Sequence, residues 1–193
     1  MPQGRGGAYP EAVNAGAGGD ATTRVRRADH ANALGRHDEA LRLASQVLAG
    51  DPTHHGASVA AGIALLSTGR VAQGIEMLRA AVAAHPDSAE VLRLLSCGYV
   101  RSGQSTWALR SARAAVALEP WEPMARCQLS EALVASGDRL AAIHEGERAV
   151  ELAPHQAQAH LTLAGPSIRR EPPPTSTSTG QSNTCAGLWN RAG

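Results

Sequence analysis

The strongest constraint on the fold is a pair of residue types that recur together along the chain. Glycine and proline each return every 34 residues, and each proline follows its glycine by 17 residues. The positions are Gly35, Gly69, Gly103 and Gly137 for glycine and Pro52, Pro86, Pro120 and Pro154 for proline. An internal period of about 20 to 50 residues indicates a repeat array, in which each unit packs mainly against its neighbours.

Each repeat predicts two helices, because apolar residues fall three and four positions apart on both sides of its glycine. In the first repeat, residues 22–34 form the first predicted helix and residues 38–49 the second, with Asp38 as the N-cap of the second. A proline soon after a helix end prevents the helix from continuing, so the proline closes the repeat. No segment alternates as a strand does, and the sequence therefore predicts an all-α chain.

The repeats leave an irregular segment at each end. Residues 1–20 contain almost no large apolar side chain and are expected to form a disordered leader. Four complete repeats follow, at residues 21–54, 55–88, 89–122 and 123–156. A fifth begins at 157 and is expected to stop at 165, because Pro166 should break its first helix. Residues 166–193 are rich in Pro, Ser and Thr, which predicts a disordered tail, and they are interpreted as replacing a longer array through truncation or a shifted reading frame.

Composition limits the core and the possible functions. Hydrophobic residues make up 43% of the chain but aromatic residues only 3%, so the buried surface must come mainly from Ala, Leu and Val. The 18 basic residues are all arginine and nearly balance 17 acidic ones, which leaves no basic footprint for nucleic acid. The three scattered cysteines, the absence of a long apolar run and the lack of a signal peptide favour a cytoplasmic protein. Abundant Ala, Gly and Arg without lysine suggest a GC-rich bacterial genome.

The array resembles the tetratricopeptide repeat, a helix–turn–helix unit of the same length. Beyond the glycines and prolines, the resemblance rests on small residues at fixed places in the second helices and on two first-helix positions. These residues are Ala40, Gly74, Ala108 and Ala142, then Ala81, Ala115 and Ala149, and finally Gly62 and Tyr99. The family's first-helix tryptophan is replaced by Arg24, Ser58, Leu92 and Arg126, and its glycine by Ala28, Ser96 and Ser130. The resemblance implies an α-solenoid of four repeats wound into a right-handed superhelix.

The same resemblance implies that the first helices line a concave groove that holds an extended peptide or a helix of a partner protein. The groove positions by register are Val25, Asp29, Asn32, Val59, Ile63, Leu66, Glu90, Arg93, Cys97, Val100, Arg101, Met124, Cys127, Glu131 and Val134. The family's clamp for chaperone carboxylates is not expected, because Val25, Asp29 and Ile63 stand at its lysine and asparagine positions.

Two arginines suggest what the groove would bind. Arg93, Cys97 and Arg101 are spaced to lie on one stripe of a helix, where two guanidinium groups could hold a carboxylate. The middle of the groove is otherwise apolar, which favours an amphipathic helix or an apolar peptide carrying an acidic residue. The alternative is that the arginines are solvated and pair with local acids such as Glu90.

No motif for catalysis, cofactor binding or metal binding is present. His54 and His55 lack the further ligands that a metal requires and are interpreted as a solvated loop pair. Cys97 and Cys127 fall on consecutive first helices, as small buried residues or as a reversible disulfide if their Cα atoms lie within about 7 Å. We therefore expect a protein that is not an enzyme and uses no cofactor or metal.

The favoured function is a protein–protein interaction scaffold, with two alternatives. The chain could be the docking or regulatory part of a larger enzyme, such as a glycosyltransferase or kinase, whose other domain is missing. It could also associate with itself, because only residues 157–165 are available to cover Val150 and Leu152 at the end of the last repeat.

Overall fold

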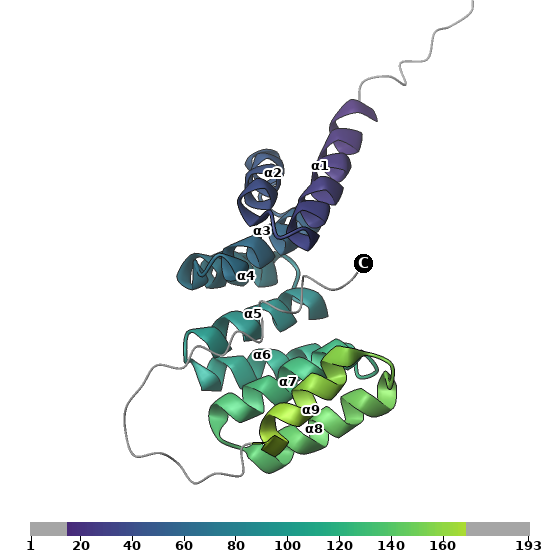
Figure 1. Ribbon diagram of the computed structural model, residues 1–193. Helices are drawn as coiled ribbons and strands as arrows, with labels where there is room; N and C mark the ends of the chain where they lie inside the picture. Colours follow the sequence, from purple (N-terminus) through teal and green to yellow (C-terminus); the bar gives the residue numbers. More distant parts are fainter. Residues whose placement is uncertain (1–14, 169–193) are drawn as a thin grey trace, which may run out of the picture.

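The computed structural model describes residues 15–168, with side chains for residues 20–162. In this part of the chain all regular structure is helical, as predicted. The helices are α1 (Ala15–Ala33), α2 (His37–Gly50), α3 (His55–Ser67), α4 (Val71–Ala84), α5 (Ala89–Arg101), α6 (Ser105–Leu118), α7 (Pro123–Ser136), α8 (Arg139–Leu152) and α9 (Ala157–Ile168). They stack in sequence order as antiparallel pairs, from α1 and α2 at one end to α8 and α9 at the other (Figure 1).

The first helices form the inner layer of the stack and the second helices the outer layer. Each helix packs against the next along the chain, and in addition α1, α3, α5, α7 and α9 pack against one another in turn. The second helices α2, α4, α6 and α8 make no such contacts with each other. A stack whose first helices lie closer together than its second helices curves toward the first helices, so these line the concave side.

The four turn glycines have the conformation that their spacing predicts. Their φ angles are 74°, 79°, 75° and 89°, in the left-handed region that side chains other than glycine adopt at a cost. At the first turn, the amide of Arg36 donates to the Ala31 carbonyl at 2.8 Å and the amide of Gly35 to the Asn32 carbonyl at 3.0 Å. This is a Schellman motif, which uses carbonyls that the helix end leaves without partners.

The prediction that Asp38 caps the second helix of the first repeat is wrong. Helix α2 begins at His37 with Arg36 at the N-cap, and no side chain bonds the free amides there. The glycine turn brings the backbone directly into the helix at Arg36, which leaves Asp38 inside the first turn. There Asp38 pairs with Arg70 at 2.5 Å. Asp138 occupies the equivalent of Arg36 in the fourth repeat, and its carboxylate does accept from the Ala141 amide at 3.1 Å.

Both ends of the array are more helical than the sequence predicted. Helix α1 begins at Ala15, within the segment assigned to a disordered leader, while residues 1–14 lie outside the described residues. Helix α9 continues through Pro166 to Ile168, so the expected break at Pro166 does not end the helix at residue 165. The proposed tail from 169 onward also lies outside the described residues.

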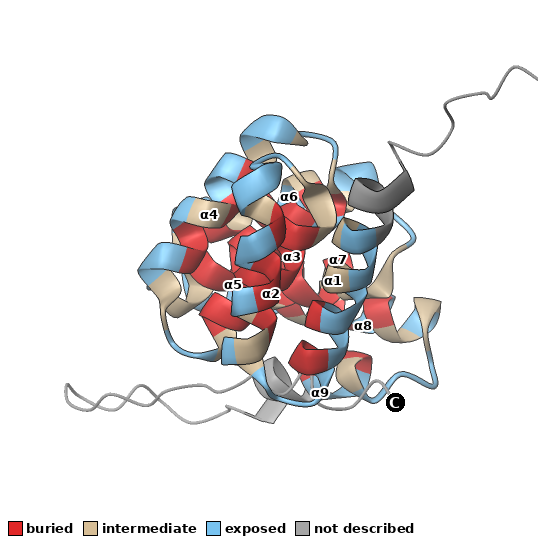
Figure 2. Cartoon of the chain, turned by 90° about the horizontal axis from the view of Figure 1, so that it is seen from above, coloured by how far each residue is buried: buried red, intermediate tan, exposed pale blue. Residues whose placement is uncertain are grey.

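The core consists of small residues and leucines between the two layers. Buried residues gather in the middle of the stack around α3 and α5 (Figure 2). At the last complete repeat, α9 packs on α7 and α8, and Ala159 joins a buried cluster with Cys127 and Ala149 against which Val150 packs. Helix α9 therefore covers part of the end that self-association would need. None of the helices in the described range is long and apolar enough to cross a membrane.

Candidate protein-binding groove

The groove positions expected from the sequence divide into a buried and an accessible set. The buried ones are Asn32, Val59, Ile63, Leu66, Cys97 and Cys127. The half-buried ones are Val25, Arg93, Val100, Arg101, Met124 and Glu131, and the exposed ones are Asp29, Glu90 and Val134. Val59, Ile63 and Leu66 of α3 belong to the same core cluster as residues of α5. Much of the expected apolar middle thus holds the repeats together, and most of the accessible positions near it are charged.

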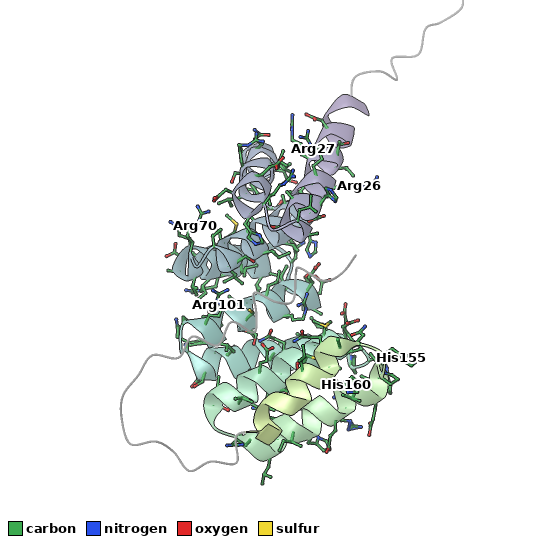
Figure 3. All side chains as sticks on the ribbon, viewed as in Figure 1. Arg26, Arg27, Arg70, Arg101, His155 and His160 are labelled. Atoms are coloured by element: carbon green, nitrogen blue, oxygen red, sulfur yellow. The ribbon has the colours of Figure 1, made fainter. Side chains whose placement is uncertain are left out.

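Asn32 and Arg101 fix the spacing of consecutive first helices. Asn32 Nδ2 donates to the Ala60 carbonyl at 2.9 Å and so joins α1 to α3. Arg101 Nη1 donates to the Leu66 carbonyl at 2.6 Å, at the end of α3, and so joins α5 to α3 (Figure 3). Leu66 lies in the last turn of α3, where its carbonyl also accepts from the Gly69 amide at 3.1 Å and where a cation is favourable. Arg101 therefore has a structural task in addition to any contact with a ligand.

Arg93 of α5 lies in an acidic environment. Burial lowers the pKa of Arg93, and the negative charges of Glu90, Glu122, Glu131 and Glu119 oppose that shift. Four carboxylates thus act on one guanidinium. A groove with this ratio carries a surplus of negative charge where the sequence suggested a positive one.

Glu131 of α7 is the most perturbed acid of the groove. Burial raises the pKa of Glu131 to about 7, against the opposing effects of the Arg93 charge and the nearby Gln128 amide. Gln128 is only 3% exposed, and its Nε2 makes no hydrogen bond of ordinary length. A carboxyl that titrates near neutral pH is a feature of binding sites.

A second pair of acids lies on the two first helices that flank α3. Asp29 lies on α1 and Glu90 on α5, two repeats apart, and both side chains are exposed. Burial of the carboxyl and then the charge of Glu90 raise the pKa of Asp29. The curvature of the stack therefore brings acids from non-adjacent repeats close enough to repel each other, which favours a cation between them.

The disulfide considered for the two groove cysteines is not present. Cys127 is a free thiol, so the disulfide considered between Cys97 and Cys127 is not formed. Burial raises the pKa of Cys127 to about 11, which makes it unreactive at neutral pH. No group of three or more metal-binding side chains exists among the described residues.

The expected solvated histidine pair instead ties two repeats together. His54 caps α3 through Nδ1, which accepts from the Ala57 amide at 3.3 Å. The Nε2 atom of His55 lies 2.7 Å from Ser88 Oγ in the next repeat, and the His55 and His85 rings pack edge to face. His85 Nε2 donates to the Thr53 carbonyl at 2.6 Å. These contacts join consecutive inter-repeat loops.

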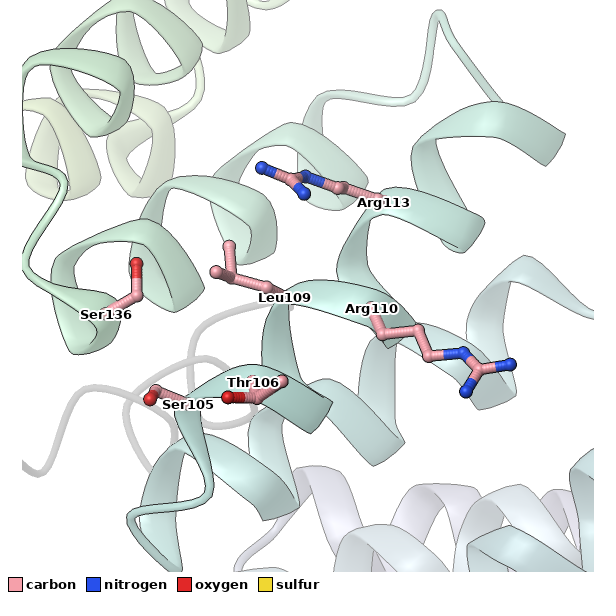
Figure 4. Close-up of a pocket in the computed structure, with 6 residues that line it drawn as sticks. All are labelled: Ser105, Thr106, Leu109, Arg110, Arg113 and Ser136. Atoms are coloured by element: carbon pink, nitrogen blue, oxygen red, sulfur yellow. The ribbon is translucent and has the colours of Figure 1, made fainter.

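A hollow on the outer layer has a different character from the groove. It has a volume of about 520 Å³ and is lined by Ser105, Thr106, Leu109, Arg110, Arg113 and Ser136. The two guanidinium groups point in different directions, and that of Arg110 lies 5.7 Å from the ring centre of Trp107 (Figure 4). They do not converge on one ligand atom, so this hollow lacks the geometry of an anion site.

Comparisons with known proteins identify the repeat. Residues 31–96 match a family model described as tetratricopeptide repeat. TTC0263, a thermophilic TPR protein from Thermus thermophilus, has a similar structure, with a TM-score of 0.70 and 22% identity over 77% of this chain and 82% of that one. MamA from Desulfovibrio magneticus RS-1 gives a TM-score of 0.63 and 20% identity over 78% and 85%. MamA MSR-1 gives 0.59 and 25% over 77% and 85%. At these identities the likeness is one of fold. No curated protein matches the chain in sequence.

Proposed function

We propose that this chain, of which residues 31–96 match the tetratricopeptide repeat, is a scaffold whose concave groove holds a segment of a partner protein. Proteins of this fold bind other proteins, which supports a protein as the partner. The observation that carries the proposal is where perturbed ionisable groups gather. Four of the six described groups with shifted pKa values, Asp29, Arg93, Cys127 and Glu131, occupy first-helix positions on the concave side, and the other two, His37 and Asp51, lie at the two ends of α2.

The charge of the groove favours a partner segment with a basic residue. The sequence suggested an acidic residue held by Arg93 and Arg101, but Arg101 donates to the Leu66 carbonyl and Arg93 is surrounded by glutamates. A carboxylate of the partner beside Arg93 would be repelled by more glutamate charges than there are arginine charges to attract it. An arginine or lysine would instead be attracted by Asp29 and Glu90, and Val25, Val100 and Met124 would contact apolar groups beside it.

Affinity capture with matched charge variants tests this function. The E90R/E131Q double variant removes two groove acids, whereas E76R changes an exposed acid of the outer helix α4. Proteins captured by the wild type and by E76R, but lost with the double variant, are groove partners, and their binding segments should be basic. Capture of the same proteins by all three forms would contradict binding in the groove, and acidic binding segments would favour the arginine clamp.

A further inference from the structure

The loop between α6 and α7 carries the most exposed aromatic side chain among the described residues. Trp121 is 79% exposed, and Leu118 just before the loop is 44% exposed. The equivalent positions in the other repeats hold the polar residues Thr53, Asp87 and His155. Exposed tryptophan costs solvation energy and is frequent at the energetic centres of protein interfaces.

Arg126 holds this loop in one conformation. Its Nε and Nη2 atoms both donate to the Pro120 carbonyl, at 3.1 Å and 2.8 Å, directly before Trp121. Its Nη1 atom bonds Glu145 Oε2 of α8 at 2.9 Å, and the two side chains are only 13% and 19% exposed. The guanidinium therefore anchors the loop to the helices beneath it, and Trp121 is presented on a rigid support. Such preorganisation lowers the entropic cost of binding.

The loop lies beside the groove at the level of Arg93. Glu119 and Glu122 stand on either side of Pro120 and Trp121, and the charges of both act on the Arg93 guanidinium. Glu122 also caps α7, accepting from the Met124 amide at 3.2 Å, which fixes its carboxylate near the groove. The Trp121 loop, residues 119–122, is thus one rim of the groove and combines an aromatic face with two carboxylates.

We propose that the Trp121 loop binds an arginine or lysine side chain of the partner segment that lies in the groove, an inference that rests on the proposed function. The cation would lie against the indole face, which attracts positive charge more strongly than any other aromatic side chain. Glu119 supplies an exposed carboxylate next to it. The negative surplus around Arg93 selects a basic over an acidic segment, and the fixed loop sets where that residue lies along the groove.

The test measures how tightly fluorescein-labelled synthetic peptides bind the full chain, by fluorescence anisotropy. One peptide alternates leucine with arginine, a second replaces arginine with citrulline, which keeps the shape without the charge, and a third replaces it with glutamate. The variants are W121A, W121F and the control H155A, which truncates the exposed loop residue at the equivalent place one repeat later. Far-UV circular dichroism checks that each variant keeps its helices.

The arginine peptide should bind best, and W121A should weaken its affinity about tenfold, the effect expected from loss of a cation–π contact. W121F and H155A should stay within about twofold of the wild type, and the citrulline and glutamate peptides should be insensitive to Trp121. Equal binding of the arginine peptide to wild type and W121A overturns the loop assignment. If E90R/E131Q still weakens the binding of the arginine peptide in that case, the proposed groove function stands without the Trp121 contact. Light scattering that detects a dimer lost in W121A would assign the tryptophan to self-contact and also overturn the inference.

Discussion

The second and fourth repeats close their helix pairs in opposite ways. In the second, Gly62 of α3 lies against Leu78 of α4, and a Cβ at Gly62 would stand 2.6 Å from Leu78 Cδ2. In the fourth, Ser130 takes the place of Gly62 and Gly146 that of Leu78. The Ser130 hydroxyl donates to the Ala142 carbonyl at 2.7 Å. The large side chain therefore comes from the outer helix in one repeat, while the inner helix supplies the larger residue in the other.

This difference continues into the groove. The residue after Gly62 is Ile63, which is buried in the core, and the residue after Ser130 is Glu131, which titrates near neutral pH. The second repeat thus uses its concave side for packing and the fourth uses it for charge. The comparison teaches that the contact between the two helices of a repeat can be filled from either helix, which is why single positions of the pattern vary.

Removal of Leu78 should have the largest effect, because this side chain fills the space that Gly62 leaves open. Leu78 is completely buried. We expect L78A to lower the free energy of unfolding by about 2 to 5 kcal/mol, from lost burial and a remaining cavity. Urea denaturation followed by circular dichroism measures the change. L118A, which truncates a half-exposed leucine of the next outer helix, is the control and should cost far less.

The variant G62S places the serine of the fourth repeat in the second repeat, and we expect it to lower the free energy of unfolding by about 1 to 3 kcal/mol. The new Cβ would stand 2.6 Å from Leu78 Cδ2 and 3.0 Å from Leu78 Cγ. The double variant G62S/L78A recreates the small outer residue of the later repeats. It should be more stable than the sum of the two single effects predicts, by about 1 kcal/mol or more. Strict additivity would show that the two positions do not share one volume.

The turns could be predicted from the sequence, but several contacts could not. A glycine and a proline at fixed spacing are local signals, and the four positive φ angles follow from them. The bond from Arg101 to the Leu66 carbonyl joins residues 35 positions apart and depends on the tilt between α3 and α5. No pattern of residue types encodes that tilt directly.

Predictions from local residue preferences were also wrong in both the outer and the inner helix layer. Asp38 is a good N-cap by residue type, but the glycine turn puts Arg36 at that place. The groove list followed from register, whereas its charge did not, because the acids around Arg93 include Glu119 and Glu122 of a loop outside the list. Trp121 was missed for the same reason. The available signal was that a tryptophan replaces the polar residue found after each of the other prolines.

The charge of the fourth repeat should make stability depend on pH. The pKa of Glu131 rises from 4.5 to about 7, so the folded chain holds this proton where the unfolded chain has lost it. Unfolding between these values releases a proton, and the contribution of Glu131 to stability therefore falls as pH rises through that window and then levels off. E131Q, which stays neutral, should gain stability over the wild type from pH 5 to 7, measured by urea denaturation. I63Q at the equivalent buried position should give a constant difference instead.

The smallest effect is expected from the serine itself. The Ala142 carbonyl that Ser130 bonds is already part of the backbone hydrogen-bond ladder of α8, so S130A leaves no acceptor without a partner. Only the extra bond is lost, and the cost should be about 1 kcal/mol. Ser96 makes the same bond to Ala108 at 2.9 Å, so S96A should cost about as much. S136A removes the exposed serine at the end of α7, whose hydroxyl donates to the Leu133 carbonyl at 2.9 Å, and is the control for loss of such a bond at the surface. A loss several times larger in S130A would mean that the serine fills volume which the comparison with Gly62 assigns to the opposite helix.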